Sequence, residues 1–253
     1  MTVLALEFPP VSHLVEWRTL FGSGAFAVNK VVLLMWAAAI IVFALSMTAA
    51  RRRQLVPAGV QNVMEAAVDF VQNGIILQTM GPEGLSWTPF LYTVFCFVLV
   101  GNLFEVVPVV QMPINARFAL PMFMALVVWV IFNYIGIKSQ GFFGYFKNML
   151  FPPGVPKPLY ALVTPIEFVT TELVRPLSLS VRLFANMLAG HLLLATFAVL
   201  STALFASTYI GAAVPFSLLV ALTGFEVLVA ALQAFIFTIL TAVYIGGSMH
   251  PEH

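Results

Sequence analysis

The sequence predicts an all-α polytopic membrane protein with about five membrane-embedded helices and one amphipathic surface helix. Hydrophobic residues fill 61% of the 253 positions, only 8% are charged, and the mean hydropathy is +1.02. Soluble domains carry roughly 25% charged residues, so this shortfall excludes an ordinary soluble enzyme, a nucleic-acid-binding protein and a disordered linker. The single cysteine, Cys96, excludes an internal disulfide and a cysteine metal cluster.

The first expected span follows an N-terminal segment, residues 1–30, which lacks the cationic start of a cleaved signal peptide. Residues 31–49 carry no charge and are long enough to cross a hydrocarbon core of about 30 Å at about 1.5 Å per residue. Arg51, Arg52 and Arg53 follow directly. Because such a cluster is held on the cytoplasmic side, residues 1–30 are expected outside the membrane.

Residues 57–77 are expected to form an amphipathic helix on the inner membrane surface. Apolar residues recur at helical spacing from Val60 to Ile75, while Glu65, Asp69 and other polar residues occupy the remaining positions. A helix with one apolar and one polar face is suited to the interfacial plane.

Residues 89–107 and 118–137 are predicted to form a transmembrane hairpin whose short, proline-bearing connection faces outward. A cytoplasmic loop, residues 138–163, is expected next. It is rich in glycine, proline and phenylalanine, and its lysines agree with the orientation set by the arginine cluster; they are Lys138, Lys147 and Lys157. The C-terminus is then cytoplasmic.

The last two apolar stretches, residues 164–205 and 214–247, are predicted to form a long, steeply tilted helical hairpin. As helices they would measure about 60 Å and about 51 Å, against a hydrocarbon thickness of about 30 Å. No turn signal divides residues 181–199, so steep tilt is favoured over two short passes. No internal repeat relates the two halves, which disfavours an inverted-repeat transporter. Residues 1–253 are predicted to be a single membrane domain.

Charged residues inside these apolar spans are the candidate functional residues, because a charge at a helix centre costs about 2.5 to 3.5 kcal/mol on insertion scales. Arg182 keeps its proton at any biological pH, so it can only repel cations or attract a carboxylate. A buried carboxyl such as Glu226 and an imidazole such as His191 can take up and release protons. Glu167 and Glu172 precede the arginine on the expected cytoplasmic side, and the histidine follows it. This order suggests a fixed positive charge between two proton-accessible paths.

A family resemblance appears at residues 176–191, which read PLSLSVRLFANMLAGH and resemble the signature of subunit a of the F-type ATP synthase membrane sector. The resemblance continues through residues 232–244 and the Glu-His ending, and more loosely through residues 101–108. It covers most of residues 89–253. It implies a stator subunit that is not an enzyme on its own and that guides protons through two offset half-channels to drive rotation and ATP synthesis.

The same resemblance implies roles for individual residues. The position of Arg182 faces the ring of c subunits, and the last two helices lie against that ring as a tilted hairpin. Acidic residues near Glu167 and Glu172 belong to the inner half-channel. Tyr244 shares a helix stripe with two half-channel positions and is grouped with them. The positions that match the outer half-channel or its wall are Asn102, Glu105, Asn186, His191, Glu226 and Gln233.

This sequence has an exchanged pair at one point of the family pattern. Some members carry a carboxylate where His191 stands and a histidine where Glu226 stands, so the pair is kept in reversed positions. The resemblance further implies as partners the c-subunit ring, peripheral-stalk b-type subunits, the remaining ATP synthase subunits and membrane lipid. It implies no cofactor, metal or nucleic acid. The expected location is a bacterial plasma membrane, with the mitochondrial inner membrane as the alternative.

Structural roles are the alternatives for the charged residues. An intramembrane arginine can snorkel or form a structural ion pair, and this alternative is stronger for Arg175 than for Arg182. Glu172 has Arg175 three residues away as a potential ion-pair partner on the same helix side. Glu105 can be an interfacial carboxylate without a relay role.

The uncharged candidates and the function class also have alternatives. His191 can be a packing histidine, and Asn186 and Gln233 can simply join helices by hydrogen bonds. An intramembrane enzyme is disfavoured because the chain lacks an HExxH motif and has a single aspartate, Asp69. A stand-alone proton-coupled secondary transporter is the second hypothesis, and it differs in turning over without a rotor.

Overall fold

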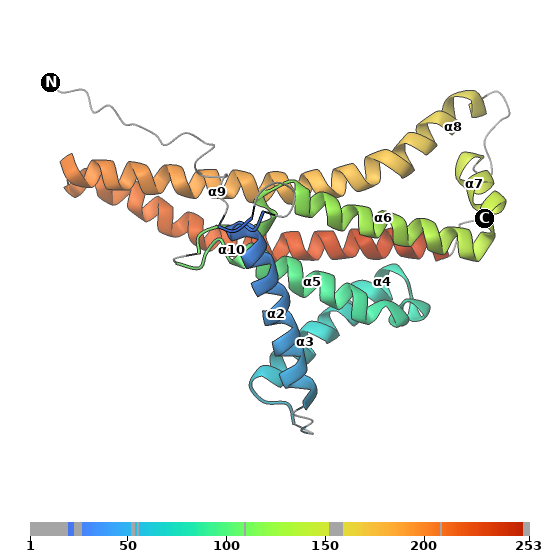
Figure 1. Cartoon of the computed structure of the whole chain (residues 1–253), viewed down its shortest axis with the longest axis horizontal. Coiled ribbons are helices and arrows are strands. Elements are labelled where there is room, and N and C mark those ends of the chain that lie inside the picture. The colour runs from blue at the N-terminus through green and yellow to red at the C-terminus, as the bar shows by residue number, and fades with distance from the viewer. Residues whose placement is uncertain are drawn as a thin grey trace. The chain divides into compact units, whose positions relative to one another are not determined.

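The computed structural model describes residues 20–22, 27–51, 54, 56–108, 110–151, 159–207 and 209–249 (Figure 1). The chain folds into two compact units that alternate along the sequence. The first unit comprises residues 1–43, 97–117 and 184–233, and the second comprises residues 44–96, 118–183 and 234–253. Several helices begin in one unit and end in the other.

The all-α fold class is confirmed in the described residues, where the β-structure is one isolated bridge between Phe21 and Val28. Helices of membrane-spanning length and apolarity confirm the polytopic prediction. These five spans are Lys30–Arg51, Pro82–Leu103, Ala119–Gln140, Leu162–Phe205 and Gly211–Met249.

Helix α2, Lys30–Arg51, begins where Asn29 accepts a hydrogen bond from the backbone N–H of Val32 at 3.1 Å, as an N-cap does. The Lys30 ammonium donates to the carbonyl oxygen of Val110 at 2.9 Å, which fixes the start of α2 against the connection that follows α5 in the first unit. Of the predicted arginine cluster, Arg51 ends the helix, and Arg52 and Arg53 lie outside the described residues.

The predicted amphipathic helix consists of three continuous segments in the second unit. They are α3, Val60–Val71, the π-helical turn η2, Gln72–Ile76, and α4, Leu77–Thr79. Val71, Ile75 and Ile76 are fully buried, whereas Val60, Glu65 and Asp69 are exposed. The helix therefore has a buried and an exposed face, and its place at the membrane surface stays a prediction.

The 3-10 turn η3, Pro82–Trp87, leads into α5, Thr88–Leu103. The chain then turns back through the short 3-10 segment η4, Ile114–Ala116, and continues into α6, Ala119–Gln140. In the first unit Gly101 lies directly against the side chain of Ile114, and a Cβ atom at residue 101 would overlap it. The glycine thereby allows η4 to pack tightly on the end of α5.

The stretch expected as a loop, residues 138–163, contains two helical segments that the sequence pattern did not predict. Gly141, with φ 75°, ends α6, and α7, Phe142–Leu150, starts immediately. Residues 152–158, which include Lys157, lie outside the described residues, and α8, Tyr160–Val169, follows them. The aromatic residues of α7 recur at helical spacing, which explains why this segment folds as a helix rather than as an open loop.

The last two helices are long, as predicted. Helix α8 continues through the π-helical turn η6, Thr170–Val174, into α9, Arg175–Ser207, and α10 is Tyr209–Met249. At about 1.5 Å per residue α9 measures about 50 Å and α10 about 61 Å. The expected break at residues 206–213 is shorter, because α10 begins before Pro215 and includes it. A proline this close to a helix start removes only a hydrogen bond near the end of the ladder.

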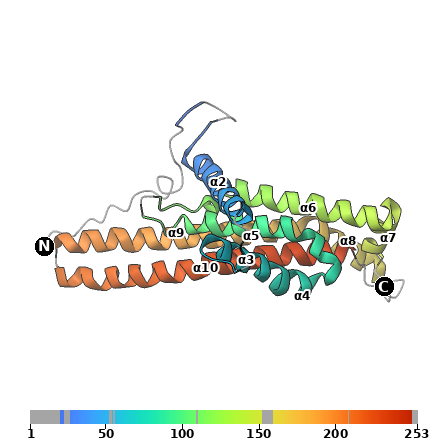
Figure 2. The same ribbon diagram turned by 90° about the horizontal axis from the view of Figure 1, so that it is seen from below.

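Each unit contains a side-by-side pairing of helices that positions candidate residues. In the first unit the adjoining parts of α9 and α10 run side by side, as Figures 1 and 2 both show. In the second unit the end of α10 lies along α6, where Ser139 donates a hydrogen bond to the Ser248 carbonyl oxygen at 3.1 Å and the rings of Phe132 and Tyr244 are 6.0 Å apart.

Candidate functional site

The first unit brings Glu105 and His191 together from distant parts of the sequence. Glu105 follows the end of α5 in a tight turn, where its backbone N–H donates to the Asn102 carbonyl oxygen at 3.1 Å. Its side chain is 3% exposed, and its Oε1 lies 3.9 Å from Nδ1 of His191 on α9. This separation permits an electrostatic pair when the imidazole is protonated. The structure thus places Glu105 inside the first unit rather than at its surface.

Glu226 on α10 belongs to the same cluster, which we call the Glu105–His191–Glu226 cluster. It is 4% exposed, and its carboxyl group lies against Gly190 of α9 so closely that a Cβ atom there would be 2.5 to 2.6 Å from three carboxyl atoms. Only glycine leaves room for this approach. Glu226 is also near enough to Glu105 for their charges to interact.

The cluster has incomplete hydrogen bonding, which bears on its chemistry. Oε1 of Glu105 and Oε2 of Glu226 are buried and have no hydrogen-bond partner among the residues that the structure describes. Two neighbouring buried carboxylates cannot both be charged without a large cost. The cluster is therefore suited to hold a proton and to pass it to water or to the adjacent imidazole.

Two amide pairs lie in the same unit. Asn115 Nδ2 donates to Asn102 Oδ1 at 2.7 Å, and both side chains are fully buried. Asn186 Nδ2 on α9 donates to Gln233 Oε1 on α10 at 2.8 Å. Sequence reasoning missed Asn115, since its contact with Asn102 depends on how the connection after α5 folds back. The amide bonds join helices, and any part they have in a proton path stays a prediction.

The other predicted residues lie in the second unit. Arg182 is exposed on α9, and its guanidinium makes no ion pair or hydrogen bond with the residues that the structure describes in this unit. Arg175 lies over the ring of Tyr244, with 5.5 Å from Cζ to the ring centroid, which is cation–π geometry. Glu167 is half-buried on α8. Arg175 thus has a contact within its own unit, whereas Arg182 has no ion-pair or hydrogen-bond partner among the described residues of that unit.

Glu172, in the π-helical turn η6, has a different environment from the ion pair that the sequence offered as an alternative. Its Oε2 accepts hydrogen bonds from Trp129 Nε1 at 2.8 Å and from Asn133 Nδ2 at 3.3 Å, both on α6. Asn133 Oδ1 in turn accepts a hydrogen bond from the Tyr145 hydroxyl of α7 at 3.0 Å. Glu172 and Arg175 form no ion pair, although both residues are described.

Tyr145 remains a hydrogen-bond donor at physiological pH. The pKa of Tyr145 is raised to about 12, mainly by burial and also by the negative charge of Glu172, while the positive charge of Arg175 lowers it. Sequence reasoning missed Tyr145, Trp129 and Asn133. The spacing of Trp129 and Asn133 places them on one face of a helix, but no sequence pattern shows that a carboxylate on another helix faces them.

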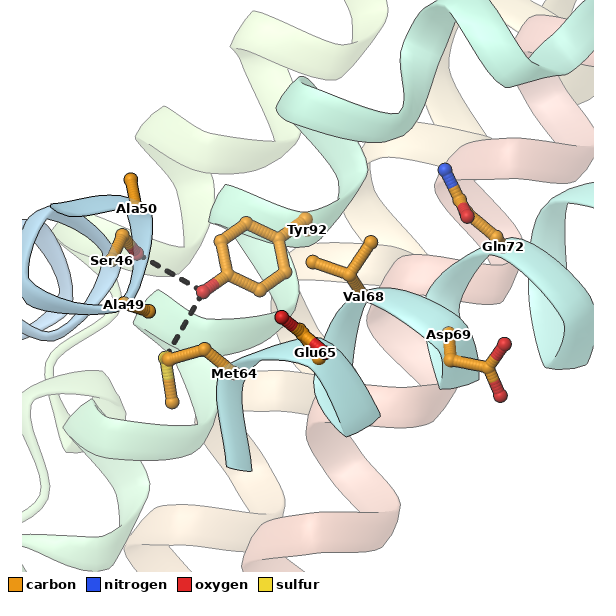
Figure 3. Close-up of a pocket in the computed structure, with 9 residues that line it drawn as sticks. All are labelled: Ser46, Ala49, Ala50, Met64, Glu65, Val68, Asp69, Gln72 and Tyr92. Carbon is orange, nitrogen blue, oxygen red and sulfur yellow. Dashed lines mark hydrogen bonds between the residues drawn. The ribbon is translucent and has the colours of Figure 1, made fainter. Parts of the chain in front are cut away.

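Two of the cavities within the second unit are bordered by carboxylate side chains. One, of about 390 Å³, is bounded by Trp129 and Glu172 and otherwise by apolar side chains such as Leu126, Leu173 and Leu177. The other, of about 500 Å³, lies among α2, α3 and α5 (Figure 3), where the Tyr92 hydroxyl is hydrogen-bonded to Ser46 at 3.0 Å and to the Met64 sulfur at 3.1 Å.

The carboxylates at the larger cavity are already engaged within their own helical segment. Glu65 accepts a hydrogen bond from Gln61 at 2.7 Å, and Asp69 accepts one from Asn73. Across the described residues, no group of three or more histidine, cysteine, aspartate or glutamate side chains is placed to hold a metal ion.

Comparison of the sequence with known proteins shows the family to which this chain belongs. The sequence model of the family described as ATP synthase A chain matches residues 32–246. The chain belongs to this family. Its proteins form the proton-channel part of the membrane sector of ATP synthase, so the chain is a component of that complex and an integral membrane protein.

Individual members of the family align over most of the chain. The ATP synthase subunit a of Frankia alni is 45% identical over 241 residues, covering 92% of this chain and 81% of the relative. That of Rhodococcus erythropolis is 39% identical over 264 residues, covering 99% and 94%. That of Acidiphilium cryptum is 38% identical over 251 residues, covering 95% and 97%.

Proposed function

We propose that this chain is the proton-translocating stator subunit of a rotary F-type ATP synthase in a bacterial plasma membrane. It provides two offset aqueous half-channels and an essential arginine, Arg182, that faces the c-subunit ring. The observation that carries the proposal is the buried Glu105–His191–Glu226 cluster, because a member of a proton-channel family has here two titratable carboxyls and an imidazole drawn from separate helices.

The outer half-channel is assigned to this cluster and its amides. Its carboxyls and imidazole can each bind and release a proton, and the unpartnered oxygens of Glu105 and Glu226 can accept hydrogen bonds from water. Proton hopping needs such closely spaced titratable groups and water. Supporting hydrogen bonds would come from Asn102, Asn186 and Gln233, and Tyr244 is assigned to the channel wall.

The role of Arg182 follows from its permanent charge. A mobile carboxylate on the c ring is stabilised next to the guanidinium only when it has lost its proton, so it must discharge on one side and reload on the other. The arginine also repels protons and other cations, which prevents direct leakage. Its exposure and its lack of an ion-pair partner among the described residues of its unit support this role.

The inner half-channel is assigned to the region of Glu167 and Glu172.

The N-terminus is proposed to lie outside and the C-terminus in the cytoplasm, because the lysines and the arginine cluster favour the cytoplasmic side. Catalysis of ATP chemistry is left to other subunits. The proposed neighbours are the c ring, b-type peripheral-stalk subunits, the remaining subunits and lipid, arranged around a single membrane domain with a tilted C-terminal hairpin.

The test is ATP-driven acidification of inverted membrane vesicles that contain the full complex. Arg182→Ala is compared with the native chain and with Arg175→Ala, which removes an arginine of the same helix that stacks on Tyr244. Immunoblotting verifies that each variant subunit is assembled. The proposal predicts loss of pumping for Arg182→Ala and retained pumping for Arg175→Ala. Full pumping by assembled Arg182→Ala complexes would contradict the essential role of Arg182.

A further inference from the structure

A hydrogen-bonded network in the second unit joins α6, α7 and the π-helical turn η6 around one carboxylate. Trp129 and Asn133 both donate to Oε2 of Glu172, at 2.8 Å and 3.3 Å, and Tyr145 donates to Asn133 at 3.0 Å. Because Asn133 accepts from the phenol through Oδ1, its amide nitrogen is turned toward the carboxylate. The network therefore holds one oxygen of Glu172 from two sides.

Close packing fixes the far end of this network. Tyr145 is 7% exposed, and its ring lies directly on the backbone of Gly136 in α6, where a Cβ atom would overlap the ring. The ring thus has little freedom to turn, and its hydroxyl stays near Asn133. Support of this kind is typical of groups whose orientation matters for function.

Glu172 itself lies in an irregular part of the backbone. The π-helical turn Thr170–Val174 interrupts the sequence of α8 and α9 with a wider, i→i+5 hydrogen-bonding pattern. Such turns are rare and occur often at functional sites, because they rotate a side chain away from the regular helix face. Here the turn carries the side chain that faces Trp129 and Asn133.

The second oxygen of Glu172 is left without a partner. Oε1 is buried and accepts no hydrogen bond from the described residues, and water in the cavity of about 390 Å³ that Glu172 borders reaches this oxygen only when a lining side chain shifts. A water molecule occupies about 30 Å³ in the liquid, so this cavity has room for several. A buried carboxylate oxygen without a donor is unfavourable, and water or a proton would supply what it lacks.

We propose that Trp129 and Asn133 are positioning residues that bind Oε2 of Glu172 and leave Oε1 as the proton-exchanging oxygen, and that the cavity beside Glu172 is the water passage of the inner half-channel. The inference rests on the proposed function. The step is a proton transfer: a hydronium ion in the cavity gives a proton to Oε1 and becomes water, and the reverse transfer restores the carboxylate. The two donors on Oε2 are retained in both states.

The test measures passive proton conduction through vesicles stripped of the soluble ATPase head. Trp129→Phe keeps an aromatic ring and removes the N–H donor, and the double variant with Asn133→Leu removes both donors. Conduction is expected to fall by about 10-fold in the double variant, as for a lost charge-assisted hydrogen bond. Trp87→Phe, a tryptophan of η3 that packs on Phe90, is the matched control and is expected to conduct normally.

Solvent deuterium distinguishes positioning from a merely structural role. A displaced carboxylate slows proton transfer itself, so the ratio of conduction in H2O to that in D2O is expected to rise in the double variant. A structural defect lowers the number of working complexes and leaves this ratio unchanged. Normal conduction, or reduced conduction with an unchanged ratio, would overturn the inference. Arg182→Ala, tested for pumping in the same membranes, shows separately whether the proposed function holds.

Discussion

At the scale of residues, the proposed function depends on a few polar groups that are unusual in an apolar core. The side chains of Glu105 and Glu226 are buried, and one carboxyl oxygen of each has no hydrogen-bond partner among the described residues. The imidazole of His191 lies 3.9 Å from the Glu105 carboxyl group. Burying such groups opposes folding, so their retention in a transmembrane bundle is best explained by function. Arg182 is exposed and has no ion-pair partner among the described residues of its unit, and a charge inside an apolar span is costly in a membrane, so it too is a candidate for function.

Neutralising the cluster tests this explanation. Glu226→Gln keeps the size and most of the hydrogen-bonding capacity of the side chain but cannot take up a proton, so proton conduction is expected to fall at least about 10-fold. Passive conduction of head-stripped vesicles measures it. Glu65→Gln, which alters an exposed carboxylate of α3, is the control. Equal conduction by the two variants would remove Glu226 from the proton path.

The contact between Gly190 and Glu226 gives a second prediction at this scale. Gly190→Ala places a methyl group in the space of the Glu226 carboxyl, so it should displace that carboxyl and lower conduction in the same assay. Gly224→Ala on α10 adds a methyl group where no atom lies within 4 Å and should be silent. Shortening the acid in Gly190→Ala with Glu226→Asp should recover part of the loss. An unaffected Gly190→Ala variant would show that the carboxyl position is unimportant.

At the scale of elements, hydropathy and helix length predict the spans but not their irregular parts. Long, mainly apolar stretches of the sequence locate the five helices of spanning length that the described residues form. The sequence pattern does not predict helix α7 or the turn η6. Helix α7 depends on the packing of Tyr145 against α6, and η6 depends on tertiary hydrogen bonds to Glu172. The contact between Glu105 and His191 likewise depends on how separate parts of the chain pack together. The sequence identifies both residues as candidates by their titratable side chains but does not predict that they lie side by side.

The docking of α7 on α6 can be tested directly. Gly136→Ala forces the Tyr145 ring away from α6, and overpacking of this kind costs about 1 to 3 kcal/mol. The solubilised complex is expected to unfold at a lower temperature and to become more sensitive to protease near residues 141–151. Gly144→Ala, whose added methyl group meets only Gln140 at ordinary contact distance, is the matched control. Equal thermal stability of the two variants would contradict the close packing of α7.

At the scale of the whole molecule, the two units divide the candidate groups. The first unit holds the Glu105–His191–Glu226 cluster, and the second holds Arg182 together with Glu167 and Glu172. A fixed positive charge such as Arg182 opposes cation passage, and for this reason the proposed function assigns the two sets to separate half-channels rather than to one continuous pore. The chain belongs to the ATP synthase A chain family over residues 32–246, and the proposed function rests on this membership.

The central claim is that proton flow past Arg182 is coupled to ATP synthesis, and ATP formation driven by an imposed pH gradient tests it most directly. Membrane vesicles with the native chain, Arg182→Ala or Arg175→Ala are given the same acid-to-base jump, and the ATP formed is measured per assembled complex. We expect synthesis with the native chain and with Arg175→Ala, and none above background with Arg182→Ala. Synthesis at the native rate by assembled Arg182→Ala complexes would contradict the claim.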